Sequence, residues 1–76
     1  MEEKEFVRNF ISQFEEGETA GISIKKRFRD IEDWSSLSAL TIIAMVDEVY
    51  NVKLNGNDII DSETIEDIYN IVKSRI

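Results

Sequence analysis

The sequence contains no cysteine, no histidine and no proline. Without cysteine the chain can form neither a disulfide nor a thiolate metal site. Without histidine it lacks the commonest general base and the commonest zinc ligand of proteins. Most hydrolase, transferase and redox mechanisms therefore lose their usual side chains, and 76 residues leave little room for an enclosed substrate pocket. We expect a protein that is not an enzyme and that binds no metal.

Positive charge is also scarce, because 9 Lys and Arg residues face 16 Asp and Glu residues, for a net charge of -7. Such a surface repels nucleic acid and anionic membranes, and it attracts basic partner surfaces. No apolar run approaches the roughly 20 residues of a membrane span. The charged start, Met1 to Glu5, lacks the apolar core of a signal peptide. We expect a cytoplasmic protein with no nucleic-acid or membrane partner.

The first helix is predicted over residues 3–15, where apolar side chains recur at helical spacing. Gly17 is expected just beyond its C-terminal end. The apolar face consists of Phe6, Val7, Phe10, Ile11 and Phe14.

A long connection follows from Gly17 to Trp34, with no sustained hydrophobic period. A structureless loop of this length is uncommon in a compact domain, so we expect apolar side chains to pin it. Its basic cluster, residues 25–29, suggests either a solvated loop or a helper in partner contact. The candidate pins are Ile22, Ile24, Phe28, Ile31 and Trp34, and the basic residues are Lys25, Lys26, Arg27 and Arg29.

The strongest helix signal covers residues 36–50, where the apolar spacing defines a core face. Beside that face lies a second one, partly apolar and partly acidic, which is a candidate contact surface. We expect Leu37 to pack under the first loop, and Leu40 either to do the same or to face a partner. The core face is Ala39, Ile42, Ile43, Val46, Val49 and Tyr50. The second face has Ser36, Leu40 and Asp47, with Leu37, Thr41, Ala44 and Glu48 further round.

After Asn51 the chain predicts a short extended piece, a turn at residues 55–57, and one helical turn at 58–61 that packs Ile59 or Ile60. Thr64 and Asp67 have the spacing of a capping box for the last helix. The apolar stripe of that helix is Ile65, Ile68, Tyr69, Val72 and Ile76. The whole chain, 1–76, is thus predicted to be one all-α domain: a bundle of three main helices and one short helix, with a long first loop.

Two adjacent serines, Ser35 and Ser36, stand at the start of the second predicted helix, where serines usually serve as caps. The segment Asp33-Trp34-Ser35-Ser36-Leu37, followed by an acidic amphipathic helix, resembles the acyl carrier protein family over essentially the whole chain. The family pattern is Asp-Ser-Leu after a long loop. The Trp34 lead-in, the pair Asp47-Glu48 and the aromatic Tyr50 also resemble that family.

This resemblance implies a fold of acyl-carrier-protein type and makes Ser36 the attachment point of 4′-phosphopantetheine, because Leu37 follows it directly. A phosphopantetheinyl transferase would supply that group from coenzyme A, and its thiol would carry acyl groups as thioesters. The implied partners are that transferase and acyl-loading and acyl-processing enzymes with basic docking surfaces, which a monomer would meet. Leu37, Leu40, Ala44, Asp47 and Glu48 would contact them.

The cargo stays open at this point, with a fatty-acyl or polyketide-like group favoured over an aminoacyl group. The position before the modified serine, where the family has Asp, is Ser35 here. That departure supports an alternative from another class: an unmodified helical interaction module that docks through the face from Leu40 to Asp47, with Ser36 only a cap.

Overall fold

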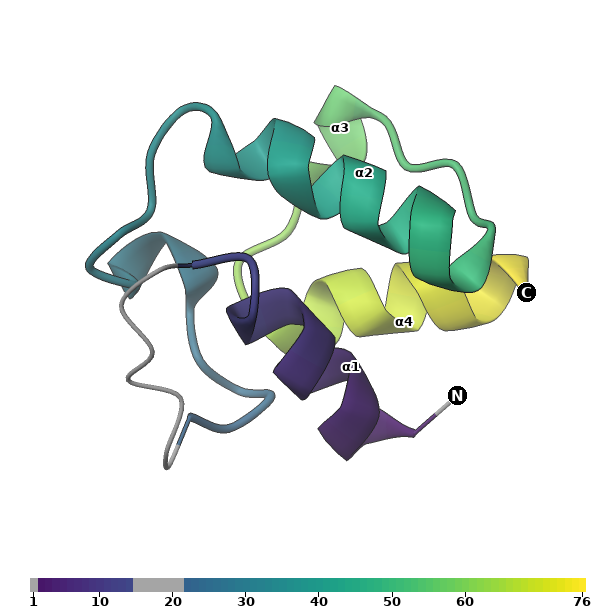
Figure 1. The fold of residues 1–76 in the computed structure, drawn as a ribbon, viewed down its shortest axis with the longest axis horizontal. Coiled ribbons are helices and arrows are strands. Elements are labelled where there is room, and N and C mark those ends of the chain that lie inside the picture. Colours follow the sequence, from purple (N-terminus) through teal and green to yellow (C-terminus); the bar gives the residue numbers. More distant parts are fainter. Residues whose placement is uncertain (1, 15–21) are drawn as a thin grey trace.

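The structure is a computed structural model that describes residues 2–14 and 22–76 (Figure 1). Within these ranges the chain forms helices and turns but no β-strand, as the sequence predicts. The elements are α1 (Glu3–Ile11), the 3-10 turn η1 (Phe28–Asp30), α2 (Ser38–Tyr50), α3 (Gly56–Ile60) and α4 (Ile65–Arg75). The predicted all-α bundle of three longer helices and one short helix is confirmed. Among the described residues, no helix has both the length and the apolarity to cross a membrane.

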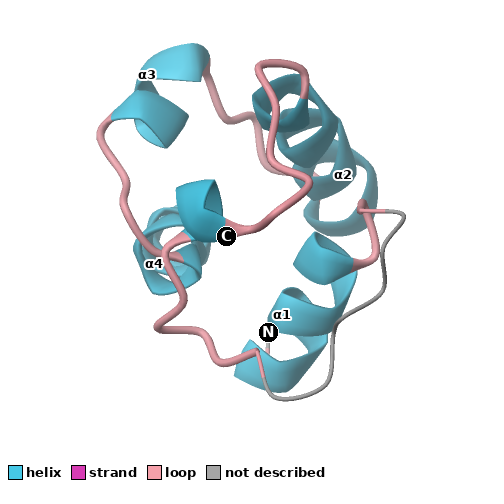
Figure 2. Cartoon of the chain, turned by 90° about the vertical axis from the view of Figure 1, so that its left-hand side faces the viewer, coloured by secondary structure: helices cyan, strands magenta, loops and turns pink. Residues whose placement is uncertain are grey.

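The three longer helices surround one apolar core (Figure 2). α1 packs against both α2 and α4, and α3 contacts α2 and α4 at the other side. These contacts follow from the helical spacing of apolar residues, which places one apolar stripe of each helix inward. The buried core residues are Phe6, Phe10, Ile11, Phe28, Ile42, Met45, Val46, Val52, Leu54, Ile59, Ile65, Ile68, Tyr69 and Val72.

α1 is shorter than the predicted 3–15, because the chain turns after Ile11. The Ser12 hydroxyl donates to the Asn9 carbonyl (2.8 Å), and the Phe14 N–H donates to the Ile11 carbonyl (3.0 Å). Phe14 thus keeps its apolar role from a turn. The predicted role of Gly17 lies outside the described residues.

α2 begins at Ser38 rather than at residue 36, and its inward face differs by one position from the prediction. Ile42 and Val46 are buried as predicted, but Val49 is 49% exposed and Met45 is buried in its place. The face that includes Ser38, Ile42, Met45 and Val46 follows the helical period equally well. α2 is apolar on several sides, so the period alone did not select the inward one.

The long first loop is pinned as predicted, with Phe28 fully buried and the other candidate pins partly buried against the core. Backbone hydrogen bonds add a second attachment at the start of α4. The Ile65 N–H donates to the Lys26 carbonyl (3.1 Å), and the Glu66 N–H donates to the Ile24 carbonyl (2.8 Å). The loop therefore runs beside the N-terminal end of α4.

The basic cluster of this loop is not simply solvated, so that interpretation is wrong for its last member. The Arg29 guanidinium donates to the carbonyls of Ser62 (2.8 Å) and Ile59 (3.0 Å), which lie at and just beyond the end of α3. Lys25 pairs with Glu66 at 2.7 Å. The Arg29 contacts add donors to carbonyls at and beyond the C-terminal end of α3, one of which, that of Ile59, also accepts the Ser62 N–H (3.1 Å).

Caps define both C-terminal helices. Thr64 and Asp67 form the predicted capping box at α4, and Asn55 and Asp58 form another at α3. α2 ends at Asn51, as predicted, in the left-handed conformation (φ 58°) that asparagine tolerates at such ends. The Asn55 and Asp58 capping box fixes the start of α3, although this helix is short.

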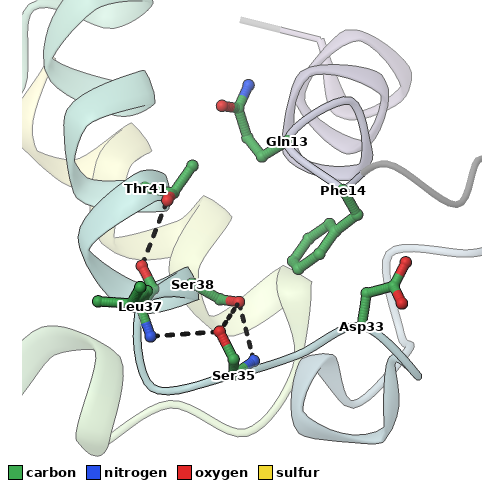
Figure 3. A pocket seen from close by; sticks show the side chains of 7 residues that line it. All are labelled: Gln13, Phe14, Asp33, Ser35, Leu37, Ser38 and Thr41. Atoms are coloured by element: carbon green, nitrogen blue, oxygen red, sulfur yellow. Dashed lines mark hydrogen bonds between the residues drawn. The ribbon is translucent and has the colours of Figure 1, made fainter.

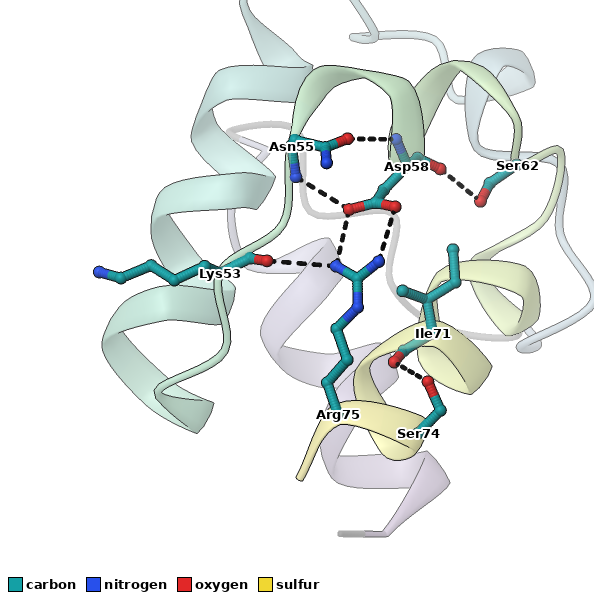
Figure 4. Close-up of polar contacts among 7 residues, drawn as sticks. All are labelled: Lys53, Asn55, Asp58, Ser62, Ile71, Ser74 and Arg75. Carbon is teal, nitrogen blue, oxygen red and sulfur yellow. Dashed lines mark hydrogen bonds and ion pairs between the residues drawn. The ribbon is translucent and has the colours of Figure 1, made fainter.

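At the end of α3, Ile59 is buried and Ile60 is 68% exposed, which resolves the choice that the sequence left open. Ile76, assigned to the stripe of the last helix, is 71% exposed beyond the end of α4, so that assignment is wrong. The end of α4 is instead held by Arg75, which reaches α3 (Figure 4).

Candidate functional site

The serine motif lies between a packed tryptophan and the start of α2. The Trp34 ring contacts the ring of Phe28 (centroids 4.8 Å apart) and that of Phe14 (5.9 Å). Phe28 and Phe14 both continue to Phe10 of α1, at 6.2 Å each. The lead-in to the motif is therefore anchored to the core by a row of aromatic rings.

Ser35 and Ser38 hold the turn at the start of α2 (Figure 3). The Ser35 N–H donates to the Ser38 hydroxyl oxygen (2.9 Å), and the Leu37 N–H donates to the Ser35 hydroxyl oxygen (3.3 Å). The Ser38 N–H donates back to the Ser35 carbonyl (3.0 Å). Ser38 is only 8% exposed, so its hydroxyl has a structural role in this turn. No local pattern in the sequence singles out Ser38.

Ser36 is exposed, and its hydroxyl has no hydrogen bond to any other residue that the structure describes. The capping interpretation is thus wrong for Ser36, while Ser35 does accept a backbone N–H. The residue before α2 is Leu37, and no side chain caps the helix from that position. Of the three serines in the motif region, Ser36 is the one left available for chemistry.

The first turn of α2 suits a negatively charged group. Within the described part of the chain, the N–H groups of Ala39 and Leu40 have no hydrogen-bond partner, and the first turn carries no acidic residue. Free N–H groups and the positive end of the helix dipole favour phosphate at such a place. Ser36 stands three and four residues before these two N–H groups, within reach of a group that it would carry.

An open cleft of about 660 Å³ lies next to the motif (Figure 3). One wall comes from the start of α2, the other from the turn after α1 and from Asp33. Its lining combines polar groups with one aromatic ring. The lining residues are Gln13, Phe14, Asp33, Ser35, Leu37, Ser38 and Thr41.

The predicted contact face of α2 is largely open to solvent. Leu37 is 68% exposed and Leu40 is 63% exposed, and Ala44 and Glu48 are exposed as well. The expectation that Leu37 packs under the first loop is wrong, because Ser38 takes the inward position at this end of the helix. Asp47 is half-buried, and its carboxylate pairs with the Lys53 ammonium at 2.8 Å.

Spacings of three, four and seven residues place Leu37, Leu40 and Ala44 along one side of α2, with Glu48 one turn further. Val49 and Ile60 are also exposed apolar side chains, and the sequence did not identify them as such.

No cluster of three or more His, Cys, Asp or Glu side chains suited to a metal ion occurs within residues 2–14 and 22–76.

Comparison with known proteins yields no relative: no protein-family model matches the chain, and neither does any curated protein or solved structure. The function must therefore be argued from the site. Its two parts are an available serine beside free N–H groups and an exposed, partly apolar helix face.

Proposed function

We propose that this protein is a carrier of acyl-carrier-protein type, in which the Ser36 hydroxyl is the attachment point of 4′-phosphopantetheine. The observation that carries the proposal is the difference between three neighbouring serines. The hydroxyls of Ser35 and Ser38 accept hydrogen bonds within the turn, whereas Ser36 is exposed and its hydroxyl has no partner among residues 2–14 and 22–76. A serine that must be modified has to be both accessible and dispensable to the fold.

The residues around Ser36 fit a phosphodiester. In the attachment reaction the Ser36 oxygen would form a bond to the phosphorus of coenzyme A that bears the pantetheine, losing its proton to the transferase as 3′,5′-adenosine diphosphate leaves. The free N–H groups of Ala39 and Leu40 would then face a bound phosphate, and the dipole of α2 would favour its charge. The attached group supplies a thiol that holds acyl cargo as a thioester. A chain without Cys or His needs such a supply.

The exposed side of α2 supports the second half of the proposal, which is docking to enzymes. Leu37, Leu40 and Ala44 offer apolar contact next to the acid Glu48, and the net charge of -7 steers basic surfaces toward the chain. The proposed partners are a phosphopantetheinyl transferase and acyl-loading and acyl-processing enzymes. We place the protein in the cytoplasm as a monomer that serves fatty-acid or polyketide-like biosynthesis.

Intact mass spectrometry tests the proposal. The protein is incubated with coenzyme A and a broad-specificity phosphopantetheinyl transferase, then with transferases from the source organism. We expect a gain of one phosphopantetheine in the unsubstituted chain and in Ser35→Ala, and none in Ser36→Ala. A gain that persists in Ser36→Ala would move the site, and no gain with any transferase would end the carrier proposal.

The second candidate is the unmodified docking module, which two observations favour. Ser35 replaces the Asp of the carrier motif, and Leu37 and Leu40 are exposed whether or not Ser36 is modified. In this case Ser36→Ala would bind partners as the unsubstituted chain does, while Leu40→Asp would not. Affinity capture of the two variants against the same partner separates the hypotheses.

A further inference from the structure

The two residues that flank Ser36 in the sequence, Ser35 and Leu37, both line the open cleft of about 660 Å³ beside the motif (Figure 3). Its far wall is built by Gln13 and Phe14, which follow α1. Ser36 itself is not among the lining residues, so a flexible chain attached to its oxygen would start next to the cleft, between two residues that line it. The volume lies within the range of about 300–1,000 Å³ that is usual for small-molecule sites.

The cleft offers an apolar surface that is held in place. The Phe14 ring is half-buried and contacts the rings of Phe10 (6.2 Å) and Trp34 (5.9 Å). Figure 3 shows this ring pointing across the cleft toward Ser35 and Ser38. An aromatic face fixed by two neighbours provides contact area without a large loss of side-chain entropy on binding.

Hydrogen-bonding groups surround that ring. Gln13 contributes an amide, Asp33 a carboxylate and Thr41 a hydroxyl. The Thr41 hydroxyl donates its proton to the Leu37 carbonyl (3.2 Å), so toward the cleft it can serve as an acceptor. This set of acceptors around one aromatic ring matches a ligand that has amide N–H groups, a hydroxyl and a small branched apolar group. It does not match a long hydrocarbon chain.

We propose that this cleft, on the α1 side of α2, is the resting site of the pantetheine arm carried by Ser36, an inference that rests on the proposed function. The arm has two amides, a hydroxyl and a geminal dimethyl group. Its amide N–H groups find acceptors in Asp33 and Gln13, and its methyl groups find the Phe14 ring. An arm held here leaves Leu40, Ala44 and Glu48 free for docking, so the cleft and the docking face share Leu37 alone.

The test uses the full chain, uniformly labelled with ¹⁵N and ¹³C, before and after attachment, with attachment first verified by intact mass. We expect amide shifts on attachment at Gln13, Phe14, Asp33 and Thr41, and nuclear Overhauser contacts between the arm methyl groups and the Phe14 ring. Thr41→Phe, which narrows the cleft and removes the Thr41 hydroxyl from its lining, should still accept the arm but lose these shifts and contacts. Val49→Phe, with the same ring at the far end of α2, should keep them.

Each result decides between defined alternatives. Shifts confined to residues 35–38, with no arm contact to Phe14, would show a free arm and overturn this inference while the carrier function stands. Shifts centred on Ala44 and Ile60 would place the arm on the other side of α2 and overturn it equally. A verified absence of mass gain would overturn the proposed function, and this inference with it.

Discussion

Arg75, the last residue of α4, forms a bidentate ion pair with Asp58 of α3. Its Nη1 lies 2.8 Å from Oδ2 and its Nη2 lies 3.0 Å from Oδ1 (Figure 4). The same carboxylate accepts the Asn55 N–H at 2.9 Å, and Arg75 also donates to the Lys53 carbonyl at 3.2 Å. The Arg75 guanidinium, together with the Asn55 N–H, holds the pKa of Asp58 below its usual 3.8. One carboxylate thus connects α3, α4 and the segment before α3.

Acid should destabilise the fold through Asp58 and Asp67. The pKa of Asp67 is also lowered, because its carboxylate accepts the N–H groups of Glu63 and Thr64. With lowered pKa values the folded state binds fewer protons than the unfolded state, so this stability is complete above the unfolded value near 3.8 and is lost as pH falls through the folded values. Urea unfolding between about pH 2 and about pH 7 measures the loss.

Asp58→Asn is the control for this prediction. Asparagine keeps a similar shape but cannot lose a proton, so the variant should start less stable at neutral pH and decline less steeply in acid. An identical pH slope in the variant and the unsubstituted chain would contradict the role assigned to Asp58.

Arg29→Ala should destabilise the protein by about 1.5–3 kcal/mol, the usual range for hydrogen bonds to a charged group. Its guanidinium donates to three carbonyls near the end of α3, those of Ser62, Ile59 and Ile60, and the variant removes these donors. Arg27→Ala is the matched control, because its ion pair with Glu63 is long (3.7 Å) and both side chains are 69% exposed. Such pairs contribute little. Equal urea midpoints for the two variants would show that the Arg29 hydrogen bonds do not stabilise the fold.

Substitution of Ser38 and of Ser36 should change the free energy of unfolding by different amounts, because only Ser38 is buried and hydrogen-bonded. Ser38→Ala removes the acceptor of the Ser35 N–H at a buried position and should cost about 1–2 kcal/mol. Ser36→Ala should change the free energy of unfolding by less than about 0.5 kcal/mol, as exposed substitutions usually do. Thermal and urea unfolding of both variants check the difference. A large loss in Ser36→Ala would reveal a structural role that its geometry does not predict.

Leu40→Asp should leave the fold intact, because the side chain is 63% exposed. If the α2 face contacts the transferase, the variant should lower kcat/KM for attachment by about tenfold or more, equivalent to about 1.4 kcal/mol. Val49→Asp places the same charge at an exposed apolar position that is not part of the predicted face. Equal attachment rates in Leu40→Asp and Val49→Asp would remove Leu40 from the docking surface.

Local signals in the sequence predicted much of the fold. The Thr64 and Asp67 capping box and the end of α2 at Asn51 depend on residues a few positions apart, so they could be recognised directly. α1 was predicted too long because Phe14 has helical spacing from Phe10, although it reaches the core from a turn. Helical spacing of an apolar residue does not show whether the backbone at that residue is helical.

Local signals in the sequence do not predict tertiary contacts. The role of Arg29 depends on Ser62, 33 residues away, and no local pattern predicts that pairing. Of the candidate site, the exposed positions of Leu40, Ala44 and Glu48 agree with the predicted face, whereas Leu37 does not pack as expected. The attachment role of Ser36 stays a prediction, and the structure adds that its hydroxyl makes no hydrogen bond to another described residue that modification would break.

The row of aromatic rings that anchors the motif gives the protein a built-in optical reporter. Trp34 is its one tryptophan, so intrinsic fluorescence excited at the red edge comes from a single ring two positions before Ser36. That ring contacts Phe14 and Phe28, which connect it to α1. One unlabelled emission signal therefore reports both on events at the serine and on the docking of the first helix.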